Sequence, residues 1–342
     1  MAVQFPKEAF LSEKQGIGRR EFLKVGVAGA VVLGAGDALA FAAAMGTPKS
    51  RVVIAKDAML RGSASTVDAS RMTALLDRAM QSSFGTKDAL AAWKQLIRPG
   101  QVVGLKVNTI AGHGLSTNVT FVEAITERLQ QAGIKPYDIV IWDRTGHELE
   151  RAGFPLSSAA GKVRCIGTDA VGYEQTPEKF GSVSSRLSKI LTQTCDVVIN
   201  LPLLKDHVAS GVTLSMKNMY GVIDNPSHYH GGGCNPGVAD VNMLPSIRKK
   251  VRFTIGDATS ACYHGGPGYK PEYVWHAESL IVGSDPVALD FTAWQIIESK
   301  RAEKGLKPLE AEGRLPRYIA TAADARHQLG TNDPKRITLV EV

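Results

Sequence analysis

The chain has little cysteine, few aromatic residues and no extended run of basic residues. Its 342 residues include 4 cysteines, at positions 165, 195, 234 and 262, and only 6% aromatics. No Cys-x-x-Cys pair occurs, which excludes a zinc knuckle or a ferredoxin-type site, so we expect no iron–sulfur cluster. The net charge of +7 is diluted, and the longest basic run is Arg248-Lys249-Lys250. This pattern argues against a nucleic-acid partner.

With 44% hydrophobic residues the chain does have enough apolar side chains to bury a large core. From residue 51 onward, short β-rich runs alternate with helical stretches, which is typical of βαβ units. We therefore predict an α/β fold, with a mostly parallel, doubly wound sheet and helices on both faces, in a single large domain over residues 51–342. Strands are expected at residues 52–55, 102–107, 138–142, 163–166, 196–201, 251–255, 279–282 and 337–340.

Two predicted helices have readable starts. Thr117 or Asn118 can cap a helix that ends near Gly133, since apolar residues recur between them at helical spacing. Asp285, which precedes a proline, predicts a second helix N-terminus. The largest irregular segment is expected to be the glycine-rich loop at residues 224–237.

Residues 1–40 resemble a twin-arginine export signal. The pair Arg19-Arg20 is followed by Phe-Leu-Lys, by a mildly apolar stretch over residues 25–36 and by an Ala-Leu-Ala exit that ends at Ala40. The stretch is shorter than the ~20 residues that span a bilayer, so no stable membrane span is expected after cleavage. The resemblance implies cleavage after Ala40 or a few residues later, a linker at residues 41–50, the twin-arginine translocase as a partner and a periplasmic location.

Polar side chains follow four of the predicted strands at the points where these strands end. They are Asn108, Asp143, Asn200 and Asp257. Any one of them is typical of a turn. Because parallel sheets bind ligands beyond the carboxyl ends of their strands, the four together predict a site at one edge of the sheet.

Most histidines also stand outside the predicted strands and helices. A lone loop histidine is typically a solvated surface residue, but imidazole is both a proton-transfer group and a metal ligand. His228 and His230, followed by Cys234, are candidates for a divalent metal site. Asp290, within an apolar run, is a further candidate or else a carboxylate that complements a helix dipole. Cys234 and Cys262 lie in glycine-rich loops and either pair after export or stay thiols.

The densest set of polar residues lies between Asn200 and Gly221. It reads NLPLLKDH from residue 200 and GVTLSMKNMYG from residue 211. Together with Gly256-Asp257 and with GSDPVALD from residue 283, these blocks resemble the domain-of-unknown-function 362 family. The resemblance covers roughly residues 51–300. It implies no general activity, and this chain departs from the members that carry a cysteine-rich ferredoxin-like segment.

Three lysines in apolar or glycine-rich surroundings indicate an anionic partner. They are Lys106, Lys205 and Lys217. A buried lysine needs either a carboxylate of its own chain or an anionic ligand. If residues 212–220 are helical, Thr213 and Lys217 lie one turn apart and face the same ligand.

These observations predict the residues of a site. We expect His207 to be the principal acid/base residue with a pKa near ~6.5, because Asp206 favours the imidazolium and the lysines disfavour it. Lys205, Lys217 and Asp143 complete the catalytic set. The residues expected to bind the substrate are Lys106, Asn108, Asn200, Thr213, Asn218, Asp257 and His264.

The function that fits best is that of an exported α/β enzyme or cofactor-binding protein acting on a small anionic substrate, with or without a divalent metal. The alternative is a periplasmic protein that binds a ligand or metal, or assists a redox partner, without turnover. Neither a P-loop nor a GxGxxG pattern precedes a helix, which disfavours a nucleotide-dependent enzyme. The sequence does not specify the substrate, the reaction or the oligomeric state.

Overall fold

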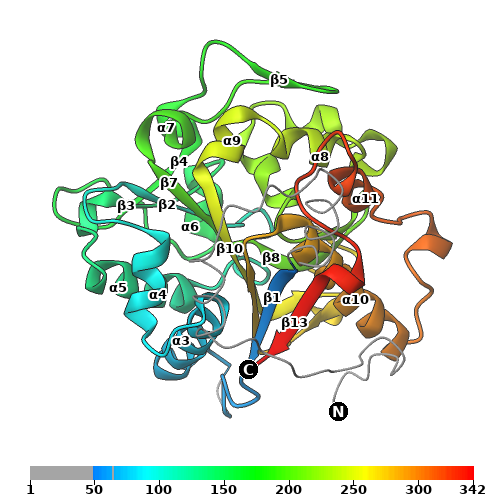
Figure 1. Ribbon diagram of the computed structural model, residues 1–342, viewed down its shortest axis with the longest axis horizontal. Coiled ribbons are helices and arrows are strands. Elements are labelled where there is room, and N and C mark those ends of the chain that lie inside the picture. Colours follow the sequence, from blue (N-terminus) through cyan, green and yellow to red (C-terminus); the bar gives the residue numbers. More distant parts are fainter. Residues whose placement is uncertain (1–48, 64) are drawn as a thin grey trace, which may run out of the picture. The chain divides into compact units, whose positions relative to one another are not determined.

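The computed structural model describes residues 49–63 and 65–342, and residues 50–342 form one compact unit. In this part of the chain the main sheet has 11 strands, ordered β13-β1-β12-β10-β7-β2-β3-β4 along its path (Figure 1). The strands of the path are β1 (Ser50–Lys56), β2 (Val103–Lys106), β3 (Ile139–Asp143), β4 (Arg164–Gly167), β7 (Val197–Asn200), β10 (Val251–Cys262), β12 (Ser279–Gly283) and β13 (Ile337–Glu341). Beside it lie β8 (Leu203–His207), β9 (Gly211–Thr213) and β11 (Val274–Trp275), while β5 (Glu178–Phe180) and β6 (Val183–Ser185) form a separate pair.

Most neighbouring strands of this sheet are parallel. β10, β7, β2, β3 and β4 pair in parallel, whereas β12 runs antiparallel to both β10 and β1. β13 is parallel to β1. The prediction of a mostly parallel α/β sheet is confirmed, and every predicted strand overlaps a strand of the structure.

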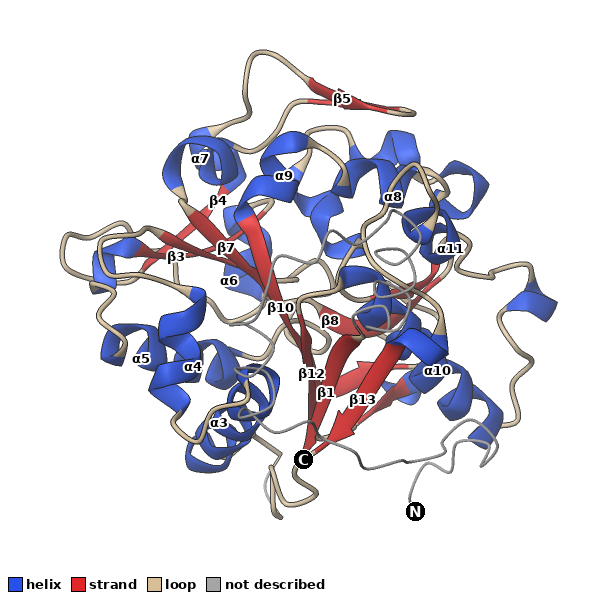
Figure 2. Ribbon diagram, viewed as in Figure 1, coloured by secondary structure: helices blue, strands red, loops and turns tan. Residues whose placement is uncertain are grey.

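Helices cover both faces of the sheet (Figures 1 and 2). One face packs against α3 (Ala69–Phe84), α4 (Ala89–Leu96) and α5 (Val119–Gln131), and the other against α8 (Gly237–Asn242), α10 (Pro286–Glu303) and α11 (Tyr318–Ala323). Successive residues of a strand point to opposite faces, so Val53 packs in the first core and Val52 in the second. The predicted doubly wound arrangement is therefore confirmed.

Short helical segments fill the connections. These are α6 (Gly146–Arg151), α7 (Thr168–Val171), α9 (Pro245–Lys250), the π-helical η3 (Ile190–Thr194) and the 3₁₀ segments η2 (Pro136–Asp138), η4 (Lys217–Val222), η5 (Pro226–Tyr229), η6 (Gly231–Cys234), η7 (Pro271–Tyr273), η8 (Glu310–Glu312) and η9 (Pro334–Arg336). The glycine-rich segment at residues 224–237 thus contains η5 and η6 before α8 begins.

The two predicted helix starts are confirmed. Asn118 precedes α5 and accepts the N–H of Phe121 at 3.1 Å. Asp285 precedes α10 and accepts the N–H groups of Val287 and Ala288, each at 2.9 Å. Both side chains satisfy amides that have no partner within their own helix.

The segment after β7 differs from the prediction. Residues 212–220 do not form one helix, because Thr213 belongs to β9 and η4 begins only at Lys217. β8 follows Pro202 and pairs with β10, so it continues the sheet beyond the end of β7. All five of its residues are buried, and three of them are polar, which hides the strand pattern in the sequence. β9 then pairs with β8 and places Thr213 opposite Lys205.

No helix in residues 49–63 and 65–342 has both the length and the apolar character needed to cross a membrane. The predicted signal at residues 1–40 and nearly all of the predicted linker lie outside the described residues.

Candidate functional site

A cavity of about 300 Å³ lies beyond the carboxyl ends of β2 and β3. The strand order reverses at β2, with β3 and β4 on one side and β7 and β10 on the other. Such a reversal is where open α/β sheets hold ligands. The predicted site residues that line the cavity are Lys106, Asn108, Asp143, Lys205, His207, Thr213, Lys217, Asn218 and His230.

Lys106, the last residue of β2, forms a buried ion pair. Its Nζ lies 2.7 Å from Asp143 Oδ1 and also donates to the Val107 carbonyl oxygen at 2.7 Å. Asp143 Oδ2 accepts from the N–H and the hydroxyl of Thr109. These donors fix the Asp143 carboxylate, which in turn positions Lys106, and this favours a positioning role for Asp143 over proton transfer. Gly221 passes so close that a Cβ there would lie 2.8 Å from Lys106 Nζ.

A chain of amides links Lys205 to the end of β7. Lys205 Nζ donates to Asn108 Oδ1 at 2.8 Å, and Asn108 Nδ2 donates to Asn218 Oδ1 at 2.9 Å. Asn218 Nδ2 donates in turn to Asn200 Oδ1 at 2.7 Å, and Asn200 Nδ2 to the Ser215 carbonyl oxygen at 2.9 Å. Asn200 therefore lies behind the cavity wall and orients the two amides that form it.

Lys205 and Lys217 are buried, and no acidic side chain of residues 49–63 or 65–342 pairs with them. The two residues are only 1% and 7% exposed. Within the described residues, Lys106 pairs with Asp143, but neither Lys205 nor Lys217 forms an ion pair with Asp or Glu. Burial lowers the pKa of each amine to about 8. For Lys205, the more distant Asp143 opposes this shift and the positive charge of Lys217 adds to it. Both amines therefore exchange protons near neutral pH.

Lys217 begins η4, and its amine faces two rings. Its Nζ lies 3.3 Å from His230 Nε2 and 3.7 Å from the centroid of the Tyr220 ring. His230 Nδ1 lies 2.9 Å from the Pro226 carbonyl oxygen, so Nδ1 carries the proton and Nε2 accepts from Lys217. Burial lowers the pKa of His230, and Lys217 lowers it further. His230 is thus a neutral acceptor at neutral pH.

His207 ends β8, rather than lying in a loop, and its ring is held in one tautomer. Nδ1 accepts the N–H of Ala209 at 3.1 Å and of Ser210 at 3.2 Å. The ring proton must then be on Nε2. Burial lowers the pKa of His207 to about 2, and the charges of Lys217, His230 and Lys205 act in the same direction. The predicted pKa near 6.5 is wrong, and His207 offers the cavity a neutral hydrogen-bond donor.

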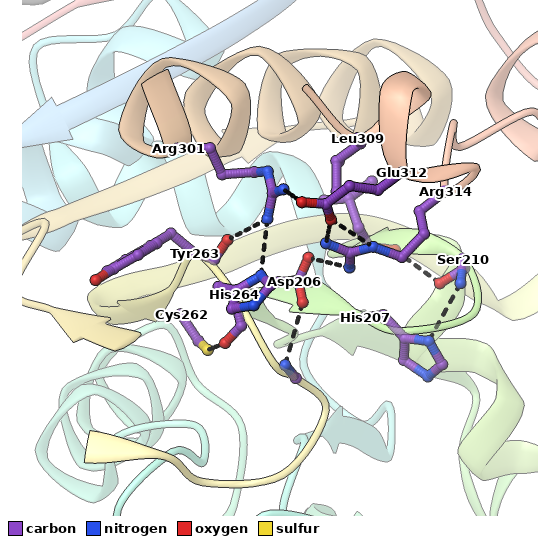
Figure 3. A network of polar contacts seen from close by, with 12 residues as sticks. Asp206, His207, Ser210, Cys262, Tyr263, His264, Arg301, Leu309, Glu312 and Arg314 are labelled. Atoms are coloured by element: carbon purple, nitrogen blue, oxygen red, sulfur yellow. Dashed lines mark hydrogen bonds and ion pairs between the residues drawn. The ribbon is translucent and has the colours of Figure 1, made fainter. Parts of the chain in front are cut away.

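Asp206 does not support an imidazolium at His207 because neighbouring residues of a strand point to opposite faces. Lys205 and His207 line the cavity, whereas Asp206 points toward Arg314 (Figure 3). Asp206 Oδ1 lies 2.7 Å from Arg314 Nη1, and Oδ2 accepts the N–H of Gly266 at 3.1 Å. Asp206, which was expected to favour a charged His207, therefore binds Arg314 and the Gly266 amide instead.

Asp206 belongs to a set of paired charges that we call the arginine network: Asp206, Arg301, Glu312 and Arg314 (Figure 3). Arg314 Nη2 lies 2.6 Å from Glu312 Oε2, and Arg301 Nη2 lies 2.7 Å from Glu312 Oε1. Arg301 is fully buried and also donates to His264 Nδ1 at 3.0 Å. The predicted substrate residue His264 therefore contacts this network and does not line the cavity.

Two other predicted site residues lie outside the cavity lining, where they accept hydrogen bonds from backbone amides. Asp257 accepts the N–H of Asn118 at 2.6 Å and of Thr259 at 2.8 Å, and burial raises its pKa. Asp290 accepts the N–H of Ser215 at 2.6 Å and the hydroxyl of Tyr318 at 3.1 Å, and burial raises its pKa to about 7. Their acceptors are occupied by groups of the protein itself.

The metal candidates do not come together. In residues 49–63 and 65–342 no group of three or more His, Cys, Asp and Glu side chains is placed to hold a metal ion. His228 is exposed, Asp290 holds backbone, and His230 and Cys234 alone make no such group. All four cysteines are buried free thiols, so Cys234 and Cys262 are not paired.

Sequence reasoning missed several residues of the cavity. Thr109 holds Asp143, Tyr220 carries the ring beneath Lys217, and Gly221 leaves room for the ion pair of Lys106. Thr109 follows a strand end directly, and the other two close the GVTLSMKNMYG block. These sequence positions could have marked the three residues as candidates, but the contacts that define their roles depend on the fold.

The fold and the cavity define an α/β protein with a cationic site at a sheet reversal. A model of the family described as domain of unknown function (DUF362) matches residues 103–295, so the chain belongs to this family. The resemblance expected from the sequence blocks is confirmed. A thylakoid-associated protein of Synechocystis sp. is 26% identical over 253 residues, which cover 67% of this chain and 76% of that protein.

Two solved structures resemble the fold in part. The lactate racemase apoprotein from Thermoanaerobacterium thermosaccharolyticum is 13% identical with a TM-score of 0.40, and covers 67% of this chain and 55% of its own. A Thermotoga maritima protein is 12% identical with a TM-score of 0.40, covering 70% of this chain and 60% of its own. The chain thus spans little more than half of each solved protein, and no activity is transferred from either.

Proposed function

We propose that the cavity binds a small anionic molecule, with Lys205 and Lys217 as the charged groups that recognise it. The observation that carries the proposal is the burial of these two amines against one cavity without an acidic partner among the described residues. A buried cation without a counter-charge costs several kcal/mol, so its retention indicates a ligand that supplies the charge.

The neutral groups of the cavity complement an anion. His207 presents its Nε2–H, and the buried hydroxyl of Thr213 has no hydrogen-bond partner in the part of the chain that the structure describes. Both line the same cavity as the lysines. A carboxylate or phosphate oxygen would satisfy these donors together with the amines.

The donor set favours an anion over a bare divalent cation. Asp143 pairs with Lys106, and Glu148, at the cavity wall, lies 3.9 Å from Arg144. A divalent cation would therefore meet amines at Lys205 and Lys217 before it met a free carboxylate. Elemental analysis of the protein purified from its own host tests for a bound metal directly.

The test is calorimetric titration of the purified protein with oxalate, malonate and inorganic phosphate, with neutral oxamide as the uncharged comparison. We expect Lys205→Met and Lys217→Met each to weaken anion binding about 10-fold or more, since a charged hydrogen bond contributes ~1.5–3 kcal/mol. The matched control is Lys94→Met, at an exposed lysine of α4. Equal anion binding by wild type and by the Lys205→Met/Lys217→Met variant would refute the proposal.

Turnover separates the two classes of function that the sequence left open. An activity screen on the anions that bind distinguishes an enzyme from a protein that only holds its ligand. Because both lysines exchange protons near neutral pH, we propose the enzyme, with an amine rather than His207 as the proton carrier.

We further propose export to the periplasm through the twin-arginine pathway, with cleavage after Ala40 or a few residues later. The motif around Arg19-Arg20 supports it, and a thylakoid association of the similar Synechocystis protein is compatible with it. Arg19→Lys with Arg20→Lys should leave the protein in the cytoplasm with its first residues uncut, whereas Lys14→Arg should not. Unchanged periplasmic recovery of the double variant would defeat this proposal.

A further inference from the structure

The amines of Lys205 and Lys217 differ in their surroundings. The Lys205 amine is held in place by its hydrogen bond to Asn108, at the end of the amide chain. Lys217 is the more exposed of the two and is touched by an imidazole acceptor and a ring face. The fixed Lys205 amine is therefore suited to binding a ligand, and the Lys217 amine, which is hydrogen-bonded to a base, is suited to nucleophilic attack.

We propose that Lys217 forms a Schiff base with a short 2-oxo acid whose carboxylate is bound by Lys205. This inference rests on the proposed function, because it assigns the anion to a substrate class. Amines that face one cavity of about 300 Å³ require the carboxylate and the reacting carbonyl to be close neighbours in a small molecule.

The other walls fit such a molecule. His207 Nε2–H and the unpartnered Thr213 hydroxyl are donors for the carbonyl oxygen. Ile110, Pro226 and Pro267 line the cavity and offer apolar surface for a short alkyl group. The site thus has donors for the carbonyl oxygen and for the carboxylate, and an apolar contact for the remainder.

The chemical step needs no additional reactant. Lys217 passes one ammonium proton to His230 Nε2, to which it is hydrogen-bonded, and its neutral nitrogen adds to the carbonyl carbon. A nitrogen proton moves to the former carbonyl oxygen, giving a carbinolamine. His230 returns its proton to the hydroxyl, the C–O bond breaks and water leaves. An ammonium ion and a carbonyl compound have then become an iminium ion and water.

A neutral fraction of Lys217 is available near neutral pH because burial lowers its pKa to about 8. Desolvation of the buried amine thus favours its neutral form, as it does for other Schiff-base lysines.

The experiment is reductive trapping. The purified protein is incubated with pyruvate and sodium borohydride, and the adduct is located by peptide mass spectrometry. We expect one reduced pyruvyl adduct, on Lys217. Lys217→Arg should abolish it, Lys205→Arg should retain the site but need more pyruvate, and Lys94→Arg should behave as wild type.

Circular dichroism shows whether Lys217→Arg folds. If it does not, a second variant provides the test. His230→Gln should slow the trapping rate in the wild-type lysine background without changing the final site, and excess oxalate should protect Lys217. An adduct on Lys205, or spread evenly over exposed lysines, would overturn the inference.

The outcomes also separate this inference from the proposed function. Oxalate binding without a pyruvyl adduct overturns the Schiff base and leaves anion binding in place. Absence of both oxalate binding and the adduct refutes both.

Discussion

The two faces of strand β8 hold buried charges in opposite ways. On one face Asp206 enters the arginine network, in which the ion pairs measure 2.6 to 2.7 Å. On the other face Lys205 meets an amide oxygen, and Lys217 across the cavity meets an imidazole. The same short strand therefore carries a paired charge on one side and, among the described residues, a cation without a carboxylate on the other.

This difference distinguishes charges that stabilise the fold from charges that we propose to bind a ligand. A buried ion pair is costly to break but complete in itself. An unpaired buried amine destabilises the folded chain, and such departures from local consistency are typical of functional sites. The arginine network should therefore control stability, and the cavity lysines should control binding.

The largest effect is expected in the arginine network. Arg301→Met should lower the free energy of unfolding by about 3–5 kcal/mol, because it breaks an ion pair of a fully buried arginine and leaves buried carbonyl oxygens without their donor. The carbonyl oxygens of Tyr263 and Lys307 would lose this donor, and Glu312 would keep only its pair with Arg314. Urea denaturation measures the loss.

The control for this prediction is Lys304→Met, at an exposed lysine beside the C-terminus of α10. It should change the free energy of unfolding by no more than ~0.5 kcal/mol. An Arg301→Met variant as stable as Lys304→Met would contradict the assignment of the network to stability.

The sequence predicted the sheet because its strands are apolar runs between readable helix caps, such as Asn118 and Asp285. It did not predict β8, whose Lys205, Asp206 and His207 are polar although all are buried. Their burial depends on neighbours far along the chain, since Asp206 and Arg314 are 108 residues apart. No local pattern encodes such pairs.

The candidate site was predicted in its residue types more than in its protonation states. The lysines and strand-end amides were read from their positions, and the structure places the three lysines and Asn108 around one cavity, with Asn200 behind its wall. The state of His207 follows from two backbone amides that turn back onto its ring and from cations brought in by other segments. Asp257 and His264 lie elsewhere because an expected strand end or loop does not specify where a side chain points.

The next effect, expected for the cavity lysines, is smaller per pH unit and makes the free energy of unfolding depend on pH. Each folded pKa of about 8 lies below the ordinary 10.5, so between these values the unfolded chain binds more protons. The free energy of unfolding of the wild type should then rise with pH, by up to ~1.4 kcal/mol per pH unit for each lysine. The penalty of the buried charge is fully present below about pH 8 and relieved above it.

Comparison with Lys205→Met/Lys217→Met isolates this dependence. Without ligand, the double variant should be at least as stable as the wild type at neutral pH, and any advantage should shrink as the pH rises. Urea denaturation across this range, with Lys94→Met as the reference, measures the gap. A gap that widens toward alkaline pH would contradict the unpaired state of the two amines.

The smallest effect is expected at His207. The test here is whether this residue acts as a neutral hydrogen-bond donor or as an acid/base that carries a proton. His207→Gln keeps an N–H donor near the position of Nε2, so anion binding should change little. His207→Phe removes the donor and should weaken binding by roughly 2- to 10-fold, the equivalent of ~0.5–1.5 kcal/mol for one neutral hydrogen bond.

Nitrogen NMR of the His207 ring should show the Nε2–H tautomer throughout the neutral range, because the pKa of about 2 lies far below it. Two backbone N–H groups aimed at Nδ1 leave no place for a second ring proton while the fold is intact. A His207 resonance that titrates near pH ~6.5 would show that these amides release the ring and would return His207 to the acid/base role.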